Sequence, residues 1–412
     1  MAERLASVVL DASTNTSLDA ALAADLAALR AAGLDRHLRI VSRRIGAIVD
    51  TLAGEAVDFS SNDYLGLATD PRLSAAALRA LNTYGTGSGA ARLISGNNPE
   101  HDALERELAA FLGVERTLTF SSGYAANVGT IAALVGRGDV IFADALNHAS
   151  LIDGCRSSRA AIHVYPHADI DALAAGLAAH RASHRRALIV SDGLFSMDGD
   201  TAPLPALVSL ARQFDAWTYV DDAHAIGVVG NQARGSAEAF GVEREIDVLV
   251  GTFGKAFGSA GAFVAGSSML CEYLLNRARS FVFSTATPAP QAAASRAAID
   301  VIRDHPGRRA RLRENVRALH AALAQRGISH AGQGDSHIVP IVIGGAARTM
   351  AVGAALAERG FLVGAVRPPT VPEGTSRLRV TLSSDHSAKQ ITNFAAALDA
   401  ALSKTLHGVS RP

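Results

Sequence analysis

Residues 246–258 read IDVLVGTFGKAFG, a short apolar run that passes into a glycine-rich turn carrying Lys255. An earlier apolar run, WTYV at residues 217–220, ends in Asp221-Asp222-Ala223-His224. Short apolar runs bounded by turn residues predict buried strands. The two stretches therefore predict nearby strands of one sheet, with Lys255 and Asp221 just beyond the strand ends.

Similar strands alternate with helices over the middle of the chain, from about residue 100 onward. We predict strands at 116–121, 140–143, 161–165, 187–191, 217–220 and 248–250, with helices at 101–112, 124–135, 170–180 and 204–214. This alternation is typical of an α/β fold with a mostly parallel central sheet covered by helices. Ligands of such folds bind beyond the carboxyl ends of the strands, and the candidate residues follow strands here.

The two ends of the chain have a different character. Before the central region, the sequence predicts a helical arm at 18–38, a short strand at 57–60, a helix at 72–83 and a glycine-rich loop at 85–96. After residue 290, it predicts a long helical stretch to about residue 326, strands at 338–343, 361–366 and 377–382, and helices at 348–359 and 387–403. We expect a helical arm in residues 1–50, a large domain in 51–290 and a smaller α+β domain in 291–412.

The composition of the 412-residue chain excludes several classes of protein. Lys+Arg and Asp+Glu number 39 each, which argues against the basic excess of a nucleic-acid or acidic-membrane binder. Two cysteines, Cys155 and Cys271, provide neither a disulfide framework nor a metal-ligand cluster. The N-terminus does not resemble a secretory signal, and no run of about 18 apolar residues occurs. We expect a cytoplasmic enzyme.

The pairing of Lys255 with Asp221 indicates a specific chemistry. A lysine on a tight turn with small neighbours can attach covalently to pyridoxal 5'-phosphate, and an acid at a nearby strand end can keep the pyridine nitrogen of that cofactor protonated. Taken alone, each residue has a simpler interpretation. Lysines in glycine-rich turns are usually solvated charges, and an acid after a strand is often a helix cap.

Other polar residues at strand ends fit the same cofactor. Gly123 and Tyr124 begin a predicted helix, whose free backbone N–H groups suit a phosphate. His148 would stack on the ring, Ser196 and His224 would contact it, and each also has an ordinary structural interpretation as a capping or turn residue. The acid motif at 221–224 invites a metal interpretation, but too few ligands accompany it. We therefore expect no metal.

The glycine-rich loop at residues 85–96 matches neither a P-loop nor a dinucleotide fingerprint, because no Gly-Lys-Ser/Thr ends it and no strand leads directly into it. A simple flexible loop is one interpretation. An anion-binding loop that is reached from a partner subunit is the other.

Several long motifs together resemble the α-oxoamine synthase family of fold type I pyridoxal phosphate enzymes. The resemblance runs from about Arg36 to the terminal helix, and its motifs are FSSNDYLGL at 59–67, RLISG at 92–96, FSMDGD at 195–200, DDAH at 221–224, GTFGK at 251–255 and RPPTVPEGTSRLR at 367–379. It implies a pyridoxal phosphate-dependent acyltransferase that acts as a homodimer, with sites at the subunit interface.

The resemblance also implies substrates and residue roles. It implies condensation of L-alanine with a pimeloyl thioester, carried by coenzyme A or an acyl-carrier protein, in biotin biosynthesis; glycine with a short acyl-CoA is the alternative. Rival classes are a nucleotide-binding oxidoreductase and a non-catalytic acyl-carrier-binding scaffold. The implied catalytic residues are Lys255, His148 and Asp221; Gly123, Tyr124, Ser196, His224 and Thr252 complete the cofactor site, and Arg36, Asn62, Thr370 and Arg379 contact substrate together with His148.

Overall fold

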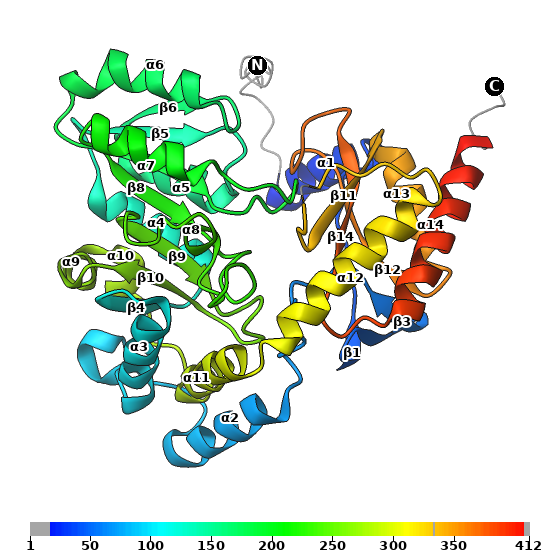
Figure 1. The fold of residues 1–412 in the computed structure, drawn as a ribbon, viewed down its shortest axis with the longest axis horizontal. Helices are drawn as coiled ribbons and strands as arrows, with labels where there is room; N and C mark the ends of the chain where they lie inside the picture. Colours follow the sequence, from blue (N-terminus) through cyan, green and yellow to red (C-terminus); the bar gives the residue numbers. More distant parts are fainter. Residues whose placement is uncertain (1–16, 333, 408–412) are drawn as a thin grey trace.

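The computed structural model describes residues 17–332 and 334–407, with side chains described up to residue 404. Residues 1–16, to which the expectation about a secretory signal refers, lie outside this range. The described chain forms a large lobe around a seven-stranded sheet and a smaller lobe that contains both ends of the described chain (Figure 1). The long helix α12 (Gly307–Ala324) extends across the smaller lobe from the side of the larger one (Figure 1).

The large sheet has the strand order β4-β10-β9-β8-β7-β5-β6. Its strands are β4 (Arg116–Phe120), β5 (Val140–Asp144), β6 (Ala161–Tyr165), β7 (Ala187–Asp192), β8 (Trp217–Asp221), β9 (Val248–Thr252) and β10 (Ala262–Gly266). Only β10 runs antiparallel to its neighbours in this sheet, pairing with β4 and β9. The predicted parallel strands are confirmed, and β10 is a strand that the sequence analysis did not predict.

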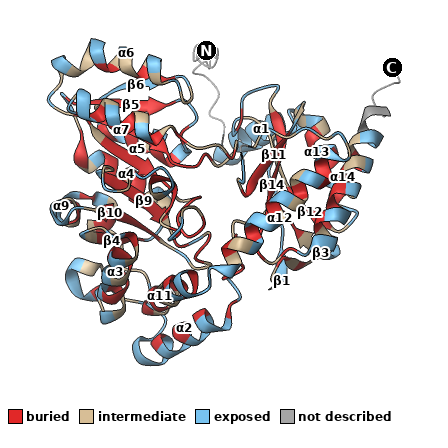
Figure 2. Cartoon of the chain, viewed as in Figure 1, coloured by how far each residue is buried: buried red, intermediate tan, exposed pale blue. Residues whose placement is uncertain are grey.

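Helices cover both faces of this sheet. They are α3 (Pro99–Leu112), α4 (Gly123–Leu134), α5 (Ala149–Ser158), α6 (Ile170–His180), α7 (Leu204–Gln213), α8 (Ser236–Ala239), α9 (Ser268–Arg277) and α10 (Arg279–Val282). Successive residues of one strand enter different apolar clusters: Ile189 belongs to one, and Leu188 and Val190 to the other. Figure 2 shows the strands as a buried layer between the helices. The central sheet is therefore covered on both sides, as expected for a parallel sheet.

The smaller lobe is an α+β unit, in agreement with the sequence. Its antiparallel sheet has the order β11-β14-β13, with β11 at Ile338–Gly344, β13 at Gly364–Val366 and β14 at Ser376–Thr381. Helices α12, α13 (Ala346–Ala357) and α14 (Ala388–His407) pack around it. The predicted long helical stretch divides into α11 (Ala289–Asp304) and α12, because Pro306 follows α11 and starts a new helix.

The N-terminal segment differs from the predicted helical arm. Helix α1 (Leu18–Ala31) ends well before residue 50, and β1 (Val41–Ile45), β2 (Ile48–Thr51) and β3 (Gly54–Asp58) follow it. β3 pairs in parallel with the short strand β12 (Phe361–Leu362), which joins this segment to the smaller lobe. The predicted boundary at residue 50 runs through β2, and the helical interpretation of 41–50 is wrong because alternating polar and β-branched residues there form a hairpin. The division into an arm and two domains stays a prediction.

No helix in residues 17–332 and 334–407 combines the length and apolarity that a membrane crossing requires. The same residues contain no group of three or more His, Cys, Asp or Glu side chains arranged to hold a metal ion.

Helix α2 (Pro71–Tyr84) packs along α11 beside the large sheet.

Candidate active site

The carboxyl ends of three adjacent strands bring the central acids and the lysine together. Asp192, the last residue of β7, is in register with Asp221, the last residue of β8. Asp221 is in turn in register with Val250 of β9, so that Lys255 follows directly beyond the end of the neighbouring strand. Lys255 and Asp221 therefore lie at the carboxyl ends of adjacent strands, and the roles assigned to them stay a prediction.

Asp221 is buried and both of its carboxylate oxygens are held. Oδ2 accepts a hydrogen bond from Nδ2 of Asn127 at 2.6 Å, and Oδ1 accepts one from the backbone N–H of Ala223 at 3.1 Å. Each oxygen keeps a further lone pair for another donor. Two hydrogen bonds to the charged form favour an anion, which is the state needed to pair with a protonated pyridine nitrogen.

A second buried acid, Asp192, lies beside Asp221. Its Oδ2 accepts the backbone N–H of His148 at 2.7 Å. Burial, reinforced by the negative charge of Asp221, raises the pKa of Asp192 well above the ordinary range of an aspartate. Two adjacent carboxylates resist being charged together, so the negative charge of Asp221 adds to the effect of burial on Asp192.

Lys255 is held in a partly neutral state by its surroundings. Burial lowers the pKa of its amine from 10.5 to about 8; the charges of Asp221 and Asp192 oppose this change, and the charge of Arg379 adds to it. Within the described part of the chain, the amine forms no ion pair. A lysine with this pKa has a substantial neutral fraction near pH 8, which a nucleophilic or proton-accepting amine requires.

Two histidines flank this group, and both are neutral imidazoles. His148 caps the N-terminus of α5, and its Nδ1 accepts the backbone N–H of Ser150 at 3.3 Å. His224 places its Nδ1 2.6 Å from the hydroxyl of Tyr64, whose ring lies edge-on to His337 with 4.1 Å between ring centroids. His148 is exposed, and desolvation by the surrounding protein atoms lowers its pKa; His224 is buried, and this burial lowers its pKa well below the ordinary range.

Arg379 of β14 reaches from the smaller lobe to the same place. Its Nε donates to the backbone carbonyl of Ser196, and its Nη1 donates to Oδ1 of Asn62 at 3.1 Å. Its Nη2 is buried and has no hydrogen-bond partner among the described residues. Because a buried guanidinium donor without a partner is costly, this atom favours binding of an anion such as a substrate carboxylate.

The phosphate side of the candidate site lies at the start of α4. Ser122 caps this helix by accepting the N–H of Ala125, and the backbone N–H groups of Gly123 and Tyr124 have no acceptor in the described chain. A helix N-terminus with free N–H groups binds phosphate well. The hydroxyl of Thr252 donates to the carbonyl of Gly261 and accepts the N–H of Gly254, so it stabilises the turn before Lys255.

Two predicted substrate residues, Arg36 and Thr370, are exposed and lie outside this buried cluster. The guanidinium of Arg367 donates to the backbone carbonyl of Asp35, which brings the segment of Arg36 next to the loop that contains Thr370. The structure therefore brings these two segments together, but it records no contact of either side chain with the buried group.

Sequence reasoning missed several members of the group. Asp192 stood in a strand-end segment that the sequence analysis noted, but the residue had no role there. Tyr64 lies within the motif at residues 59–67. It stands two residues after Asn62, a predicted substrate residue, and this position was the available signal. Asn127, Ser150 and Tyr219 lie within helices or a strand and carry no local sequence signal of function. They are identified only by their burial and by their contacts.

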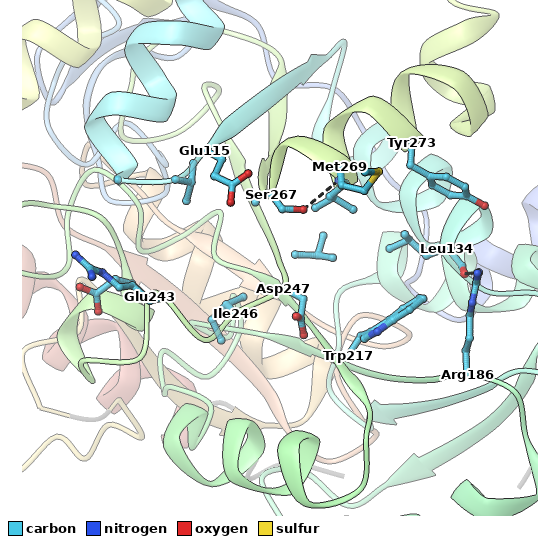
Figure 3. A pocket seen from close by; sticks show the side chains of 16 residues that line it. Glu115, Leu134, Arg186, Trp217, Glu243, Ile246, Asp247, Ser267, Met269 and Tyr273 are labelled. Atoms are coloured by element: carbon cyan, nitrogen blue, oxygen red, sulfur yellow. Dashed lines mark hydrogen bonds between the residues drawn. The ribbon is translucent and has the colours of Figure 1, made fainter.

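One described cavity is a different site. It measures about 540 Å³ and lies at the opposite edge of the sheet, where Trp217 begins β8 and Val248 begins β9. Figure 3 shows Trp217, Arg186 and Asp247 around it, with Met269 and Tyr273 on the wall formed by α9. Neither Lys255 nor Asp221 lines this cavity, so it is separate from the candidate active site.

The buried group fits pyridoxal phosphate on three independent observations. Lys255 is a partly neutral amine without an ion pair in the described chain, which suits covalent attachment to an aldehyde. Asp221 is an anion with spare lone pairs, which suits a protonated ring nitrogen. The first N–H groups of α4 are free to bind phosphate.

Comparisons with known proteins agree with this chemistry. The family Aminotransferase class I and II matches residues 55–398. The chain is 51% identical over 381 residues to an 8-amino-7-oxononanoate synthase of Anaeromyxobacter dehalogenans, with 92% of this chain and 95% of that protein covered. It is 50% identical over 379 residues to the 8-amino-7-oxononanoate synthase of Geobacter sulfurreducens, with 92% and 96% covered.

Solved structures share the fold. A serine palmitoyltransferase of Sphingomonas wittichii superposes with a TM-score of 0.89 at 32% identity, covering 94% of this chain and 98% of that one. The 8-amino-7-oxononanoate synthase of Francisella tularensis superposes with a TM-score of 0.73 at 27% identity, covering 85% and 98%. The chain therefore belongs to the aminotransferase class I and II family of pyridoxal phosphate-dependent enzymes, in the branch of the 8-amino-7-oxononanoate synthases.

Proposed function

We propose that the protein condenses L-alanine with a pimeloyl thioester to form 8-amino-7-oxononanoate, CO₂ and a free thiol, a step of biotin biosynthesis. The observation that carries this proposal is the juxtaposition of Lys255, with its lowered pKa, and the buried anion Asp221 at adjacent strand ends. Relatives about half identical over nearly the whole chain, named for this activity, support it.

Lys255 and Asp221 have complementary roles in the proposed reaction. Pyridoxal phosphate, when bound, supplies an aldehyde for covalent attachment and a cationic ring that withdraws electrons from the Cα of the amino acid. Lys255 would hold the cofactor through Nζ, and its amine would take the Cα proton of alanine and later return a proton. Asp221 keeps the proton on the ring nitrogen. Positioned proton transfer of this kind contributes on the order of 10² to 10⁴ in rate.

The surrounding residues orient the two partners. His148 would lie on the ring, His224 and Ser196 would contact its edge, and Gly123, Tyr124 and Thr252 would lie by the phosphate. Because His148 is neutral, it would not repel the positive charge that Asp221 stabilises on the ring nitrogen.

Arg379 is the group best suited to the alanine carboxylate. The unpartnered Nη2 of this residue is buried, and Asn62 holds the neighbouring Nη1 at 3.1 Å. A fixed guanidinium with a free donor binds a carboxylate with a defined orientation. Arg36 and Thr370, on adjoining exposed segments of the smaller lobe, would contact the more distant acyl donor.

A homodimer would complete the site. The motif of residues 92–96 lies against α10 through a bridge between Ala91 and Thr285, and Ile94 and Phe283 beside it are 80% and 71% exposed. Tyr124 at the phosphate end of the site is also exposed. Exposed apolar side chains on these neighbouring segments support an interface there, and a second copy of the chain is the partner that the family resemblance implies.

Product analysis tests the substrates. Purified enzyme would be incubated with L-alanine, glycine or L-serine, each with pimeloyl-CoA or acetyl-CoA, and the products identified by mass spectrometry. We expect 8-amino-7-oxononanoate and CO₂ with L-alanine and pimeloyl-CoA. Efficient turnover of glycine with acetyl-CoA, without a pimeloyl product, would instead assign the enzyme to the glycine-using alternative.

A further inference from the structure

A buried polar network connects Asp221 with His148 through residues that do not face the ligand space themselves. Its members are Asn127 in α4, Ser150 in α5 and Tyr219 in β8, and all three are at most 1% exposed. Nδ2 of Asn127 lies 2.6 Å from Oδ2 of Asp221 and 2.8 Å from Oγ of Ser150. The hydroxyl of Ser150 lies 2.7 Å from Nδ1 of His148.

The direction of each hydrogen bond follows from the donors available. Tyr219 donates its hydroxyl to Oδ1 of Asn127 at 2.8 Å, so the amide group of Asn127 must turn its NH₂ toward Asp221 and Ser150. The opposite orientation would place the amide oxygen against the Asp221 carboxylate. Asn127 therefore uses two N–H donors and one acceptor, which leaves the hydroxyl proton of Ser150 free to be donated onward.

His148 receives the end of this network. The hydroxyl of Ser150 and its backbone N–H, at 2.7 and 3.3 Å, both point donors at Nδ1 of the imidazole. Nδ1 is therefore the unprotonated nitrogen, and the single proton of the neutral ring lies on Nε2. A proton on Nδ1 would face two donors, so the network stabilises the neutral ring in one tautomer and orientation.

Stability alone does not account for these residues. They lie beside the apolar cluster that contains Ile131, Leu151 and Tyr219, and Gly154 of α5 lets that helix approach the backbone of Asn127 closely. Buried polar groups must be fully hydrogen-bonded to be tolerated. Well-packed apolar side chains in their place are often neutral or stabilising, so a function at the site is the better explanation for the network.

We propose that Asn127, acting with Ser150 and Tyr219, is a positioning residue that couples the acid under the pyridine nitrogen, Asp221, to the histidine on the ring face, His148. The inference rests on the pyridoxal phosphate role of the site but on neither alanine nor the thioester. Asn127 donates to Asp221 to favour its charged form, and through Ser150 it holds the neutral His148 in place.

Three variants interrupt the network at different points. Ser150→Ala separates His148 from Asn127, Tyr219→Phe releases the amide oxygen, and Asn127→Asp replaces the donor to Asp221 with an oxygen in nearly the same volume. Ser158→Ala is the matched control, because this serine lies in the same helix and bonds only to backbone groups. Each protein would be prepared without cofactor and titrated with pyridoxal phosphate.

Two readouts separate positioning from a merely structural role. The first is the cofactor dissociation constant, and the second is the pH midpoint of the visible absorbance of the bound cofactor. We expect Asn127→Asp and Ser150→Ala to weaken cofactor binding by about tenfold or more, the effect of losing one hydrogen bond to a charged or aligned group. Tyr219→Phe should weaken cofactor binding by about threefold. All three network variants should shift the pH midpoint of the absorbance. Ser158→Ala should change neither the dissociation constant nor the midpoint.

The inference is overturned if all variants lose stability in urea yet keep the wild-type dissociation constant and midpoint. It is also overturned if Ser150→Ala and Ser158→Ala behave alike. Should Asn127→Asp not fold, the two smaller changes decide the question. These readouts use no substrate, so a wild-type enzyme that binds cofactor but forms no 8-amino-7-oxononanoate would refute the proposed substrates and leave this test intact.

Discussion

At the scale of single residues, the site depends on Lys255 being reactive while Asp221 stays charged. Burial acts on both, and the outcome differs because their partners differ. Asp221 receives hydrogen bonds from Asn127 and Ala223, whereas the amine of Lys255 forms no ion pair with any residue in the described ranges. Burial therefore leaves the lysine amine without an ion pair among the described residues, while the carboxylate of Asp221 keeps two hydrogen-bond donors.

Buried Lys255 makes the stability of the cofactor-free enzyme depend on pH. Its pKa is about 8 when folded and 10.5 as the ordinary value, so the unfolded chain binds more protons between these values. Stability therefore rises as pH increases from about 8 to 10.5, by on the order of 1–3 kcal/mol. Urea unfolding of the apoenzyme across this range should show the rise, and Lys255→Met should lack it. If the unfolding free energies of the two proteins changed with pH in parallel, the lowered pKa assigned to Lys255 would be contradicted.

Arg379 should affect the amino acid and not the cofactor. Arg379→Lys keeps the charge but loses the planar group that also contacts Ser196 and Asn62. We expect the KM for L-alanine to rise by about tenfold to a hundredfold, since a bidentate charged contact is lost, with cofactor absorbance unchanged. Arg377→Lys, two residues earlier and paired with Asp198, is the control for charge in the same strand. Equal effects of the two substitutions would remove the carboxylate role.

The residues that sequence could identify were those with a local signal. Lys255 and Asp221 stand where apolar strands pass into turns, and that pattern is visible without a structure. Asn127 and Tyr219 stand inside ordinary helix and strand patterns, so only the packing of α4 against α5 and the large sheet reveals their contacts. Arg36 and Thr370 came from the resemblance alone, and their roles stay predictions.

At the scale of elements, β9 and the turn after it position the lysine. The turn is held by Thr252 and by Gly258, whose φ of 60° and close neighbours admit only glycine. A Cβ on Gly258 would lie 2.3 Å from the backbone nitrogen of Ala68. The segment after Phe59 therefore supports the catalytic turn directly.

This close approach can be tested with a matched pair of glycines. Gly241 also has a positive φ of 72° but open space around it, so Gly241→Ala should cost only about 1–2 kcal/mol of unfolding free energy. Gly258→Ala adds a clash with backbone atoms, and we expect a loss about 2 kcal/mol larger together with weaker cofactor binding. Urea unfolding and cofactor titration measure both effects. Equal losses for the two variants would show that the turn does not press against residues 67–68.

Element prediction succeeded where periodicity was regular. The parallel strands and their helices follow the alternation of apolar runs with amphipathic segments. It failed at β10, where Ala262–Gly266 is short and follows a glycine-rich turn, and at β1 and β2, which lie in the predicted arm; the predicted strand at 57–60 overlaps β3, but its pairing with β12 joins residues about 300 positions apart. Such long-range pairing has no local signal.

At the scale of the whole molecule, the site is assembled from both lobes. Arg379 and Arg377 of the smaller lobe contact Ser196 and Asp198 of the loop after β7, and Arg308 of α12 pairs with Asp70 at the start of α2. The residues proposed to hold the cofactor therefore come from the large sheet, and the arginine proposed to bind the substrate carboxylate comes from the other lobe. This arrangement explains why the site needs nearly the complete chain.

The proposed homodimer gives a prediction at this scale. In analytical ultracentrifugation the protein should sediment at twice the mass of the 412-residue chain. Combining Ile94→Asp with Phe283→Asp should give monomers with weaker cofactor binding, because charges in an apolar interface are unfavourable. Leu52→Asp, at an equally exposed apolar position elsewhere, should leave the dimer intact. A fully active wild-type monomer at micromolar concentration would contradict the proposed interface.

The covalent link between Lys255 and pyridoxal phosphate is the most direct test of the account. The purified holoenzyme would be reduced with borohydride, digested and mapped by mass spectrometry, with Lys389 and Lys404 as internal comparisons. We predict a single pyridoxyl group on the peptide that contains Lys255, and none after the same treatment of Lys255→Ala. A pyridoxyl group on another lysine, or an unmodified Lys255 in fully active enzyme, would contradict the central claim.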